Sequence, residues 1–347
     1  MTDLVEQDDA KKVGKKMKAI VHEGKIGLEG LVYREMPERR PGPGEVRVNL
    51  KTAGLNYRDL LILNRHLPAE PPFIVGSDGA GIISAVGPGV TRFKTGDEVM
   101  INPALGWLEK SGAAPDTFSV LGYPRDGTFA EAVIVPDANV VIKPEYLTWE
   151  EAGVFSLAAL TAYRVLFTKG RLTSGMKVLI PGIGGGVATF LLFMAKAAGA
   201  RVYVTSRTPE KRKRAIELGA DIAIDSQGDW QEALVGERMD LVIESVGAST
   251  FHHALDQLRP GGTMVAFGAS TGDVVSLNLR RFFYGQFQLL GSTMGSAEEY
   301  QEMIRFVQEH QIRPVVDQMF PLHDYGKAFD RMAGGRQFGK IGFWIGA

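Results

Sequence analysis

The chain has 347 residues, of which 45% are hydrophobic and 23% are charged, and its formal net charge is −1. This near-neutral charge gives no reason to expect nucleic acid or a membrane surface as a partner, and no apolar run is long enough to span a bilayer. A cysteine count of zero excludes disulfides, thiolate metal ligands and a cysteine nucleophile. Residues 1–16 are polar and lack the apolar core of an export signal, so a flexible tail and a cytoplasmic location are expected.

Residues 17–150 have the pattern of short strands separated by turns. Glu45 to Leu50 alternates polar and apolar side chains, as a half-buried strand does, and the turn-forming Pro41 to Gly44 precedes it. Another strand is expected at residues 79–89, between glycine turns. Short strands with frequent glycine and proline indicate a mostly β, barrel-like domain.

From Thr148 onward the pattern changes to alternating strands and helices. Thr148 and Glu151 have the spacing of a capping box, which marks the start of a helix. Strands are expected at residues 178–180, 201–205, 240–244 and 262–268, and helices at 187–198, 209–218 and 251–258. These repeated β–α–β units predict an α/β fold with a doubly wound parallel sheet over residues 151–311.

A glycine-rich turn lies between the first predicted strand and helix of this sheet. A tight turn requires Gly182, close approach to a pyrophosphate requires small residues at Gly184 and Gly185, and Ala188 lets the helix pack on the strand. The helix start adds free N–H groups and partial positive charge. The predicted phosphate site consists of Gly182, Ile183, Gly184, Gly185, Gly186 and Val187. The alternative is a tight turn without a ligand, although three consecutive glycines lose much backbone entropy on folding.

The end of the second strand indicates which dinucleotide is bound. In NAD-binding proteins an acidic residue at this place accepts hydrogen bonds from the ribose hydroxyls. Here Ser206 and Arg207 follow the strand, and Lys211 comes four residues later. A guanidinium can hold a 2′-phosphate with two hydrogen bonds, and the hydroxyl and the ammonium add to it. We therefore predict NADP(H); the alternative is that these side chains form a solvated helix start.

Three parts of the sequence resemble the medium-chain dehydrogenase/reductase superfamily, in particular its quinone oxidoreductase and zinc-free enone reductase branch. They are residues 53–59 with 72–81 and 86–99, residues 158–163 with the glycine turn, and residues 339–342. The resemblance implies a GroES-like catalytic domain, a Rossmann domain, and a return of residues 312–347 to the first domain. It also implies an active site in the cleft between the domains and a homodimer.

The zinc ligands of that family are mostly missing. Zinc-dependent members place cysteine at the position of Asn56, His-Glu at Ser77-Asp78, and a third ligand near Leu157. Only an acid, Asp78, is retained, whereas catalytic zinc needs three good ligands, so no metal is expected. Residues 102–125 stand where the structural-zinc lobe would lie, without its four cysteines. We expect them to pack as a cover or a subunit contact; a substrate lid is the alternative.

The chemistry follows from the missing Lewis acid. Hydride transfer to a simple carbonyl is difficult without one, whereas a quinone or an α,β-unsaturated carbonyl needs only a donor to the oxygen that becomes negative. The resemblance places Asn56 and Tyr57 near the nicotinamide. Asn56 would orient the ribose or the substrate carbonyl, and Tyr57 would donate a hydrogen bond to the enolate oxygen. Asp59 is expected to cap this turn, and a core aromatic is the alternative for Tyr57.

Further cofactor contacts are expected from the family and from the strand ends. Thr161 would face the cofactor, and Lys340 belongs to a C-terminal Gly-Lys pair, with a surface lysine as the alternative. The loops after the later strands add Val246, Phe267, Gly268, Ser292, Thr293 and Met294, although strand-end packing also accounts for Phe267. His66 is expected to be a satisfied surface histidine rather than a pocket residue, and His252 and His253 are expected on a helix surface.

The leading hypothesis is an NADPH-dependent reductase of quinones or α,β-unsaturated carbonyls, with a small-molecule substrate and no nucleic-acid or membrane partner. One alternative is a zinc-free enzyme of alcohol dehydrogenase descent that acts on another substrate. The other is a non-catalytic NADPH-binding protein with a redox-sensing role. The pair Asn56 and Tyr57 favours the reductase over the pure binder.

Overall fold

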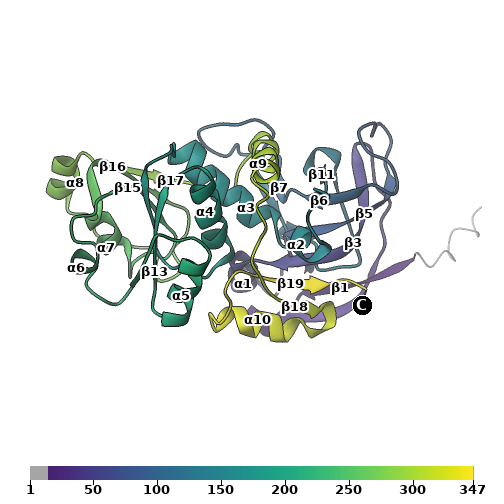
Figure 1. The fold of residues 1–347 in the computed structure, drawn as a ribbon. Helices are drawn as coiled ribbons and strands as arrows, with labels where there is room; N and C mark the ends of the chain where they lie inside the picture. The colour runs from purple at the N-terminus through teal and green to yellow at the C-terminus, as the bar shows by residue number, and fades with distance from the viewer. Residues whose placement is uncertain (1–14, 347) are drawn as a thin grey trace, which may run out of the picture.

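The computed structural model describes residues 15–346, which form a parallel-sheet part and a β-rich part that lie side by side (Figure 1). The parallel sheet has six strands in the order β14-β13-β12-β15-β16-β17, and every neighbouring pair runs parallel. Its strands are β12 (Lys177–Ile180), β13 (Arg201–Ser206), β14 (Ile222–Asp225), β15 (Met239–Glu244), β16 (Leu258–Ala266) and β17 (Gln288–Gly291). This arrangement confirms the predicted doubly wound sheet.

Helices connect these strands, as the alternating pattern predicts. They are α4 (Gly186–Ala197), α5 (Pro209–Glu217), α6 (Trp230–Ala233), α7 (Phe251–Asp256) and α8 (Leu279–Gly285). Where an element was predicted, its boundaries differ by a residue or two, except that β16 begins at Leu258 rather than at residue 262. The elements β14, β17, α6 and α8 were not predicted. The strand β16 starts early because Leu258 pairs with Met239 of β15 before a register shift, and a register shift leaves no periodic signal in the sequence.

The β-rich part is built around a second sheet, to which the end of the chain contributes. The strand order is β11-β6-β5-β3-β19-β18, and β10 also pairs with β3. The strands are β3 (Glu45–Leu55), β5 (Asp78–Val86), β6 (Glu98–Ile101), β10 (Ala132–Pro136), β11 (Val140–Ile142), β18 (Val316–Pro321) and β19 (Lys340–Trp344). Because β19 pairs with β3, Lys340 and Asn56 come close although they are far apart in the sequence.

Two smaller sheets and several helices complete the β-rich part and its border. The sheets are β2-β1-β4, with β1 (Lys16–His22), β2 (Leu31–Pro37) and β4 (Phe73–Ile74), and β7-β8-β9, with β7 (Ala104–Leu105), β8 (Ser119–Leu121) and β9 (Pro124–Arg125). The helices are α1 (Tyr57–Leu63), α2 (Trp149–Gly153), α3 (Ser156–Tyr163), η3 (Arg164–Lys169), α9 (Ala297–Glu309) and α10 (Tyr325–Ala333); the short turns η1 (Gly27–Gly30), η2 (Asp137–Asn139) and η4 (Leu322–Asp324) lie between them.

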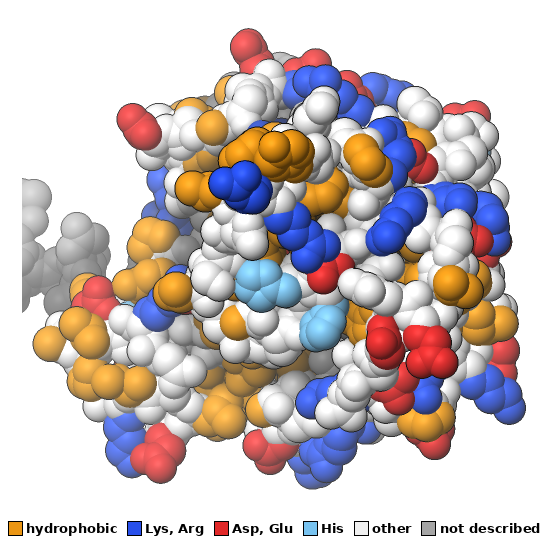
Figure 2. All heavy atoms as spheres, turned by 90° about the vertical axis from the view of Figure 1, so that its left-hand side faces the viewer, with side chains coloured by type: hydrophobic (Ala, Val, Ile, Leu, Met, Phe, Trp, Pro, Cys, Tyr) orange, Lys and Arg blue, Asp and Glu red, His pale blue; other side chains and the backbone are white. Residues whose placement is uncertain are grey.

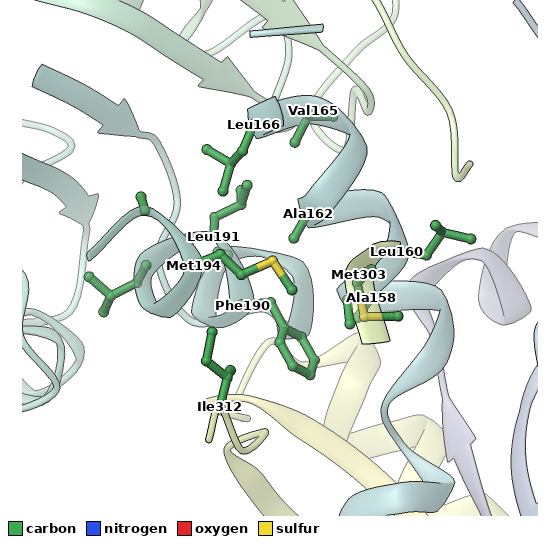
Figure 3. Close-up of a cluster of buried hydrophobic side chains, with 14 of the residues drawn as sticks. Ala158, Leu160, Ala162, Val165, Leu166, Phe190, Leu191, Met194, Met303 and Ile312 are labelled. Carbon is green, nitrogen blue, oxygen red and sulfur yellow. The ribbon is translucent and has the colours of Figure 1, made fainter. Parts of the chain in front are cut away.

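A continuous core joins the two parts where α3, α4 and α9 meet (Figure 3). The small side chains Ala158 and Ala162 of α3 allow α4 to approach closely, and the ring of Phe190 on α4 packs edge-on against Phe155, with centroids 4.8 Å apart. The same cluster includes Met100 of β6 and residues of β12. Because interiors are close-packed, this core fixes the position of one sheet relative to the other.

The structure bears on three further expectations, which concern the N-terminal tail, membrane-spanning helices and the helix start at Thr148. The predicted flexible tail falls mainly on residues 1–14, which lie outside the described residues, whereas Lys16 already begins β1. Between residues 15 and 346, no helix is long and apolar enough to cross a membrane. The predicted helix start at Thr148 is confirmed, since its hydroxyl accepts from the backbone N–H of Glu151 and Glu151 accepts from the N–H of Thr148.

Candidate active site

The glycine turn lies between β12 and the start of α4. Gly182 and Gly184 have φ angles of +76° and +137°, which other residues rarely adopt. A Cβ atom on Gly186 would lie 2.3 Å from Cδ of Lys340, whereas the space at Gly185 is open. Within residues 15–346 no side chain caps the N-terminus of α4. The turn therefore presents backbone N–H groups and an open approach, as a bound phosphate requires.

The predicted 2′-phosphate residues lie at the end of β13. Ser206 is buried and its Oγ accepts from the N–H of Thr208, whereas Arg207 is exposed. Nζ of Lys211 lies 2.8 Å from the carbonyl of Gly335, and its stem lies beside Gly184. Burial lowers the pKa of Lys211. The N–H of Ile183 donates to the carbonyl of Thr205, so the end of β13, which carries these side chains, lies beside the glycine turn.

Arg212 also lies at the end of β13, and it was not predicted from the sequence. Its guanidinium donates to the carbonyl of Ser206 and forms an ion pair of 3.2 Å with Asp225. The signal in the sequence is the run Lys211-Arg212-Lys213 at the start of α5. Arg212 holds the end of β13 in place, because it binds the Ser206 backbone rather than facing open space.

The loops after β15, β16 and β17 open toward the same edge of the sheet as the glycine turn. Glu244, the last residue of β15, is buried and shapes its loop by accepting from the N–H groups of Val246 and Gly247 at 2.6 and 3.0 Å. Burial raises the pKa of this carboxyl. Glu244 was also missed, since an acid that ends a buried strand gives no distinctive sequence pattern.

Six buried side-chain atoms have no hydrogen-bond partner among the described residues, and two of them belong to segments at the carboxyl edge of the parallel sheet or beside the glycine turn. One is Oγ of Ser292, which follows β17, and the other is Oε1 of Gln337. Gln337 lies two residues before Gly339, whose N–H donates to the carbonyl of Gly184. Buried polar groups are rarely left without partners, so these atoms fit a polar ligand at the turn. The residues present therefore fit a dinucleotide whose phosphates lie at the start of α4.

A buried polar cluster connects this turn to the β-rich part. Lys340 donates to Oδ1 of Asn56 at 2.5 Å and to Oδ2 of Asp78 at 3.0 Å. Asn56 in turn donates to Oδ2 of Asp78 at 3.1 Å, and the N–H of Leu157 donates to the other oxygen of Asp78 at 2.7 Å. All of these side chains come from different elements, namely the end of β3, the start of β5, α3 and the start of β19. The alternative of a surface lysine for Lys340 is wrong, because its side chain is 3% exposed.

A second buried carboxyl, that of Asp59, holds the backbone of Asn56 in place. Asp59 accepts from the backbone N–H of Asn56 at 2.8 Å and from the hydroxyl of Ser77 at 3.2 Å, which confirms its predicted capping role. Arg58 donates to the same Ser77 oxygen at 2.7 Å. Burial raises the pKa of Asp59 to about 6, although the nearby Arg58 charge works in the opposite direction. The backbone at Asn56 is thus fixed by hydrogen bonds.

The remaining candidate residues lie in different surroundings. Tyr57 is 47% exposed at the start of α1, so the core alternative is wrong. Thr161 is buried and its hydroxyl donates to the carbonyl of Leu157. His252 and His253 are exposed on α7, as expected.

The expected surface position of His66 is wrong. His66 is fully buried, with Nδ1 2.8 Å from Nδ1 of His22 and Nε2 3.1 Å from the carbonyl of Pro71. The reason is the fold of the chain, since β1 brings His22 against the end of α1 and lets two polar rings satisfy each other. The sequence places these histidines 44 residues apart and gives no sign of their contact.

The three positions at which the family holds catalytic zinc do converge in this structure, but around an ammonium group. Asn56, Asp78 and the backbone of Leu157 form one hydrogen-bonded group with Lys340. Among the described residues, no group of three His, Cys, Asp or Glu side chains is placed to hold a metal ion. One carboxylate, one amide and a lysine cation do not match the donor set that catalytic zinc requires.

Residues 102–125 pack within the same chain, against α9 and η3. The carbonyls of Trp107 and Leu108 accept from the N–H groups of Ala297 and Glu298, which begin α9. Arg164 donates to the carbonyl of Ser111 at 2.9 Å and lies over the Trp107 ring, 4.5 Å from its centroid. The segment therefore forms a cover over the border between the two parts, one of the two roles expected for it.

Comparison with known proteins identifies the family. The sequence matches the family models of the alcohol dehydrogenase GroES-like domain over residues 42–145 and of the zinc-binding dehydrogenases over residues 186–309. A zinc-type alcohol dehydrogenase-like protein of Schizosaccharomyces pombe is 34% identical over 94% of this chain and 98% of its own. A quinone oxidoreductase of Pseudomonas aeruginosa is 31% identical over 90% of this chain and 95% of its own.

Solved structures agree with this assignment. The crystal structure of an NAD-dependent alcohol dehydrogenase has a TM-score of 0.88 and 36% sequence identity, and the match covers 95% of this chain and all of that one. A match over almost the whole of both chains shows that the two share their fold. The chain therefore belongs to the medium-chain dehydrogenase/reductase superfamily of oxidoreductases, with a GroES-like domain and a Rossmann domain.

Proposed function

We propose that this oxidoreductase transfers hydride from NADPH to a quinone or an α,β-unsaturated carbonyl, and that it does so without zinc. The observation that carries the proposal is the group of Asn56, Asp78 and Lys340, which fills the place of the metal with a hydrogen-bonded ammonium. Conjugated acceptors spread the incoming charge onto an oxygen, so hydrogen-bond donors suffice to stabilise it. A relative that bears the name quinone oxidoreductase supports this reading.

The cofactor is proposed to lie along the carboxyl edge of the parallel sheet. Its pyrophosphate would bind at residues 182–187, and its 2′-phosphate would bind Ser206, Arg207 and Lys211. The further contacts proposed are Thr161, Val246, Phe267, Gly268, Ser292, Thr293, Met294 and Lys340. The bound cofactor would supply the hydride, and Tyr57 would donate to the acceptor oxygen. Asn56 would orient the ribose or the substrate through the hydrogen-bonded group that it forms with Lys340 and Asp78. Since a similar structure is that of an NAD-dependent enzyme, the preference for NADPH is a point that direct measurement decides.

Steady-state kinetics test the reaction. We expect the purified enzyme to oxidise NADPH with members of a panel of quinones and enones, and to keep that activity after treatment with a chelator. Elemental analysis should find no stoichiometric zinc. Oxidation of simple alcohols alone, with about one zinc per chain, would show a conventional alcohol dehydrogenase. NADPH binding without turnover on any acceptor would show a cofactor-binding protein instead.

The protein is also proposed to be a homodimer that pairs through the free edge of its parallel sheet. The strand β17 ends the sheet, and the neighbouring helix α8 has no buried residue among those described. Exposed hydrophobic side chains gather there, including Leu279, Phe283, Tyr284 and Leu289. Figure 2 faces the end of the molecule at which α8 lies in Figure 1, and shows hydrophobic side chains together in its upper part. Exposed apolar patches of this kind mark association surfaces.

A further inference from the structure

The arrangement of donors around Lys340 carries an inference about the reaction itself. Its ammonium has three N–H donors, and two of them are held by Asn56 Oδ1 and Asp78 Oδ2. No acceptor for the third is found among residues 15–346. The aliphatic stem of Lys340 meanwhile lies against Gly186, at the start of the helix that borders the phosphate turn. Lys340 therefore lies between the phosphate turn and the pair Asn56 and Asp78, with one N–H of its ammonium left for a ligand.

The two neighbours of Lys340 have little capacity left for a substrate. The Oδ1 atom of Asn56 already accepts from Lys340, and its Nδ2 atom donates to Asp78. The oxygens of Asp78 accept from Asn56, Lys340 and the N–H of Leu157. An acceptor oxygen that enters the site thus meets the lysine as its charged donor. Charge-assisted hydrogen bonds are about twice as strong as neutral ones.

We propose that Lys340 is a catalytic residue that donates its free N–H to the substrate oxygen on which negative charge develops during hydride transfer. The inference rests on the proposed function, and it assigns to Lys340 the charge that a metal supplies in zinc-dependent relatives. As the β-carbon of an enone gains the hydride with its electron pair, the π electrons move to the carbonyl oxygen and form an enolate. Lys340 stabilises that oxygen, Tyr57 adds a neutral donor, and a proton from water completes the product.

The burial of the pair explains why the lysine is held in place here. The side chains of Lys340 and Asp78 are 3% and 0% exposed, so each compensates a charge that the other would leave buried. A donor that is fixed before the reaction needs no reorganisation when charge develops on the substrate. The interaction with the acceptor oxygen is therefore expected to be stronger in the transition state than in the ground state, which changes turnover more than binding.

The test compares Lys340→Met, which keeps the length and removes the charge, with Lys340→Arg, which keeps the charge. We expect Lys340→Met to lower kcat with an enone on the order of a hundredfold, as for the loss of one oxyanion donor, and to change the Kd of NADPH by less than about tenfold. Lys340→Arg should recover part of the activity. Lys327→Met is the matched control, because Lys327 is a 70% exposed lysine whose ion-pair partner is Asp324. An unchanged kcat, or a loss confined to NADPH affinity, would overturn the proposal.

A double variant tests the proposal if Lys340→Met does not fold. In Asp78→Asn/Lys340→Met both buried charges are removed, so no uncompensated carboxylate remains. If this variant folds and stays slow, the lysine has the proposed role. If it regains full turnover, Lys340 only balances Asp78 and the proposal is wrong.

A binding experiment separates this inference from the proposed function. The enzyme with NADP⁺ is titrated with para-nitrophenol, whose oxygen mimics the charge of an enolate and whose ionisation is followed by absorbance. We expect the wild type and Lys340→Arg to lower the pKa of the bound phenol, and Lys340→Met to abolish that shift. A shift that persists in Lys340→Met, or no shift in the wild type, contradicts the role of Lys340. Failure of the wild type to reduce any quinone or enone would contradict the proposed function alone.

Discussion

At the scale of single residues, the candidate site combines local motifs with contacts between distant parts of the chain. The glycine turn and the capping role of Asp59 follow from spacings of a few residues, and the structure shows both. Lys340 is 284 residues from Asn56 in the sequence, so its contact with that residue gave no local signal. The contact between His22 and His66 was not predicted for the same reason, because the two residues are 44 positions apart. Side chains that meet only through sheet pairing cannot be matched from periodicity.

Asp59 makes stability depend on pH between about 4 and 6. Its pKa is raised from 3.8 to about 6, so the folded state keeps a proton that the unfolded state loses in this range. Its contribution to stability is therefore fully present below about pH 4 and is lost as pH rises through 6. At about 1.4 kcal/mol for each pKa unit, the change is about 3 kcal/mol.

Urea unfolding of the wild type and of Asp59→Asn at pH 4 and pH 7 measures this effect. The asparagine does not titrate. The pH-dependent contributions of all other groups to the free energy of unfolding therefore cancel when the two proteins are compared. We expect the wild type to lose about 3 kcal/mol relative to the variant between the two pH values, by the same pKa arithmetic. A difference between the two proteins that is the same at both pH values would show that folding does not change the pKa of Asp59.

Tyr57→Phe is expected to lower turnover with an enone while it leaves NADPH affinity nearly unchanged. The hydroxyl is available for a substrate because Tyr57 is 47% exposed. Loss of one donor to a developing oxyanion lowers kcat roughly tenfold to a thousandfold, and less for a quinone, which accepts hydride readily. Tyr284→Phe, at a 70% exposed position on α8, is the control. Equal activity of Tyr57→Phe and wild type on every acceptor would make the tyrosine structural.

Arg207→Ala is expected to weaken NADPH binding and to leave NADH binding unchanged. Arg207 is exposed beside Ser206, where a 2′-phosphate would meet its guanidinium. A hydrogen bond to a charged group contributes about 1.5–3 kcal/mol, so the Kd of NADPH should rise roughly tenfold to a hundredfold. Fluorescence titration with both cofactors measures this, with the exposed Lys213→Ala as control. Equal affinity of the wild type for NADH and NADPH would remove the basis of the prediction.

At the scale of elements, the alternating pattern after Thr148 predicted four strands and three helices of the Rossmann domain closely, whereas β14, β17, α6 and α8 were not predicted. Each of those elements buries one face against a neighbour that follows soon in the sequence, so periodicity reports it. Residues 102–125 lacked such a pattern, and their structure depends on α9, almost 200 residues later. Lys110 shows this, because its ammonium pairs with Glu302 at 2.9 Å. The sequence could therefore narrow their role only to a cover, a subunit contact or a lid.

The buried ion pair under this cover should matter strongly for stability. Arg164 and Glu299 have side chains that are 1% and 0% exposed, and their closest atoms are 2.6 Å apart. Loss of one partner leaves a buried charge uncompensated, which costs about 3–5 kcal/mol. We therefore expect Arg164→Met to lower the free energy of unfolding by about that amount, and Arg164→Met/Glu299→Gln to recover part of it.

Denaturant unfolding monitored by Trp107 and the other tryptophans measures the effect. Lys327→Met serves as the control, since it breaks an exposed pair with Asp324 and should change stability by less than about 1 kcal/mol. If Arg164→Met is as stable as this control, the segment 102–125 does not depend on Arg164 for its position.

At the scale of the whole molecule, the chain closes on itself through β19. This strand pairs with β3 and places Lys340 at the end of the glycine turn, where Gly339 bonds to Gly184. The proposed active site thus draws on the first third of the chain, its middle and its last nine residues. Periodicity describes each of these pieces but not their meeting; only the family resemblance implied it. The family resemblance therefore predicted that these pieces meet, whereas the ion pair of Lys340 and Asp78 was not predicted.

The free edge of the parallel sheet gives the last prediction. The strand β17 has a neighbour on one side only within residues 15–346, and the apolar side chains of α8 lie beside it. Two copies related by a two-fold axis could pair these edges and cover Leu289, which is 40% exposed, and Phe283, which is 59% exposed. A stable interface of this kind buries more than about 1,000 Å².

We expect sedimentation equilibrium to give about twice the chain mass of 37.7 kDa for the wild type. The double variant Leu289→Lys/Phe283→Glu should sediment as a monomer, because it places unpaired charges in the covered patch. Val235→Lys is the matched control, since Val235 is an 82% exposed residue outside this edge. A wild type that sediments as a monomer, or a charged double variant that remains dimeric, would show that this edge is not where two copies meet.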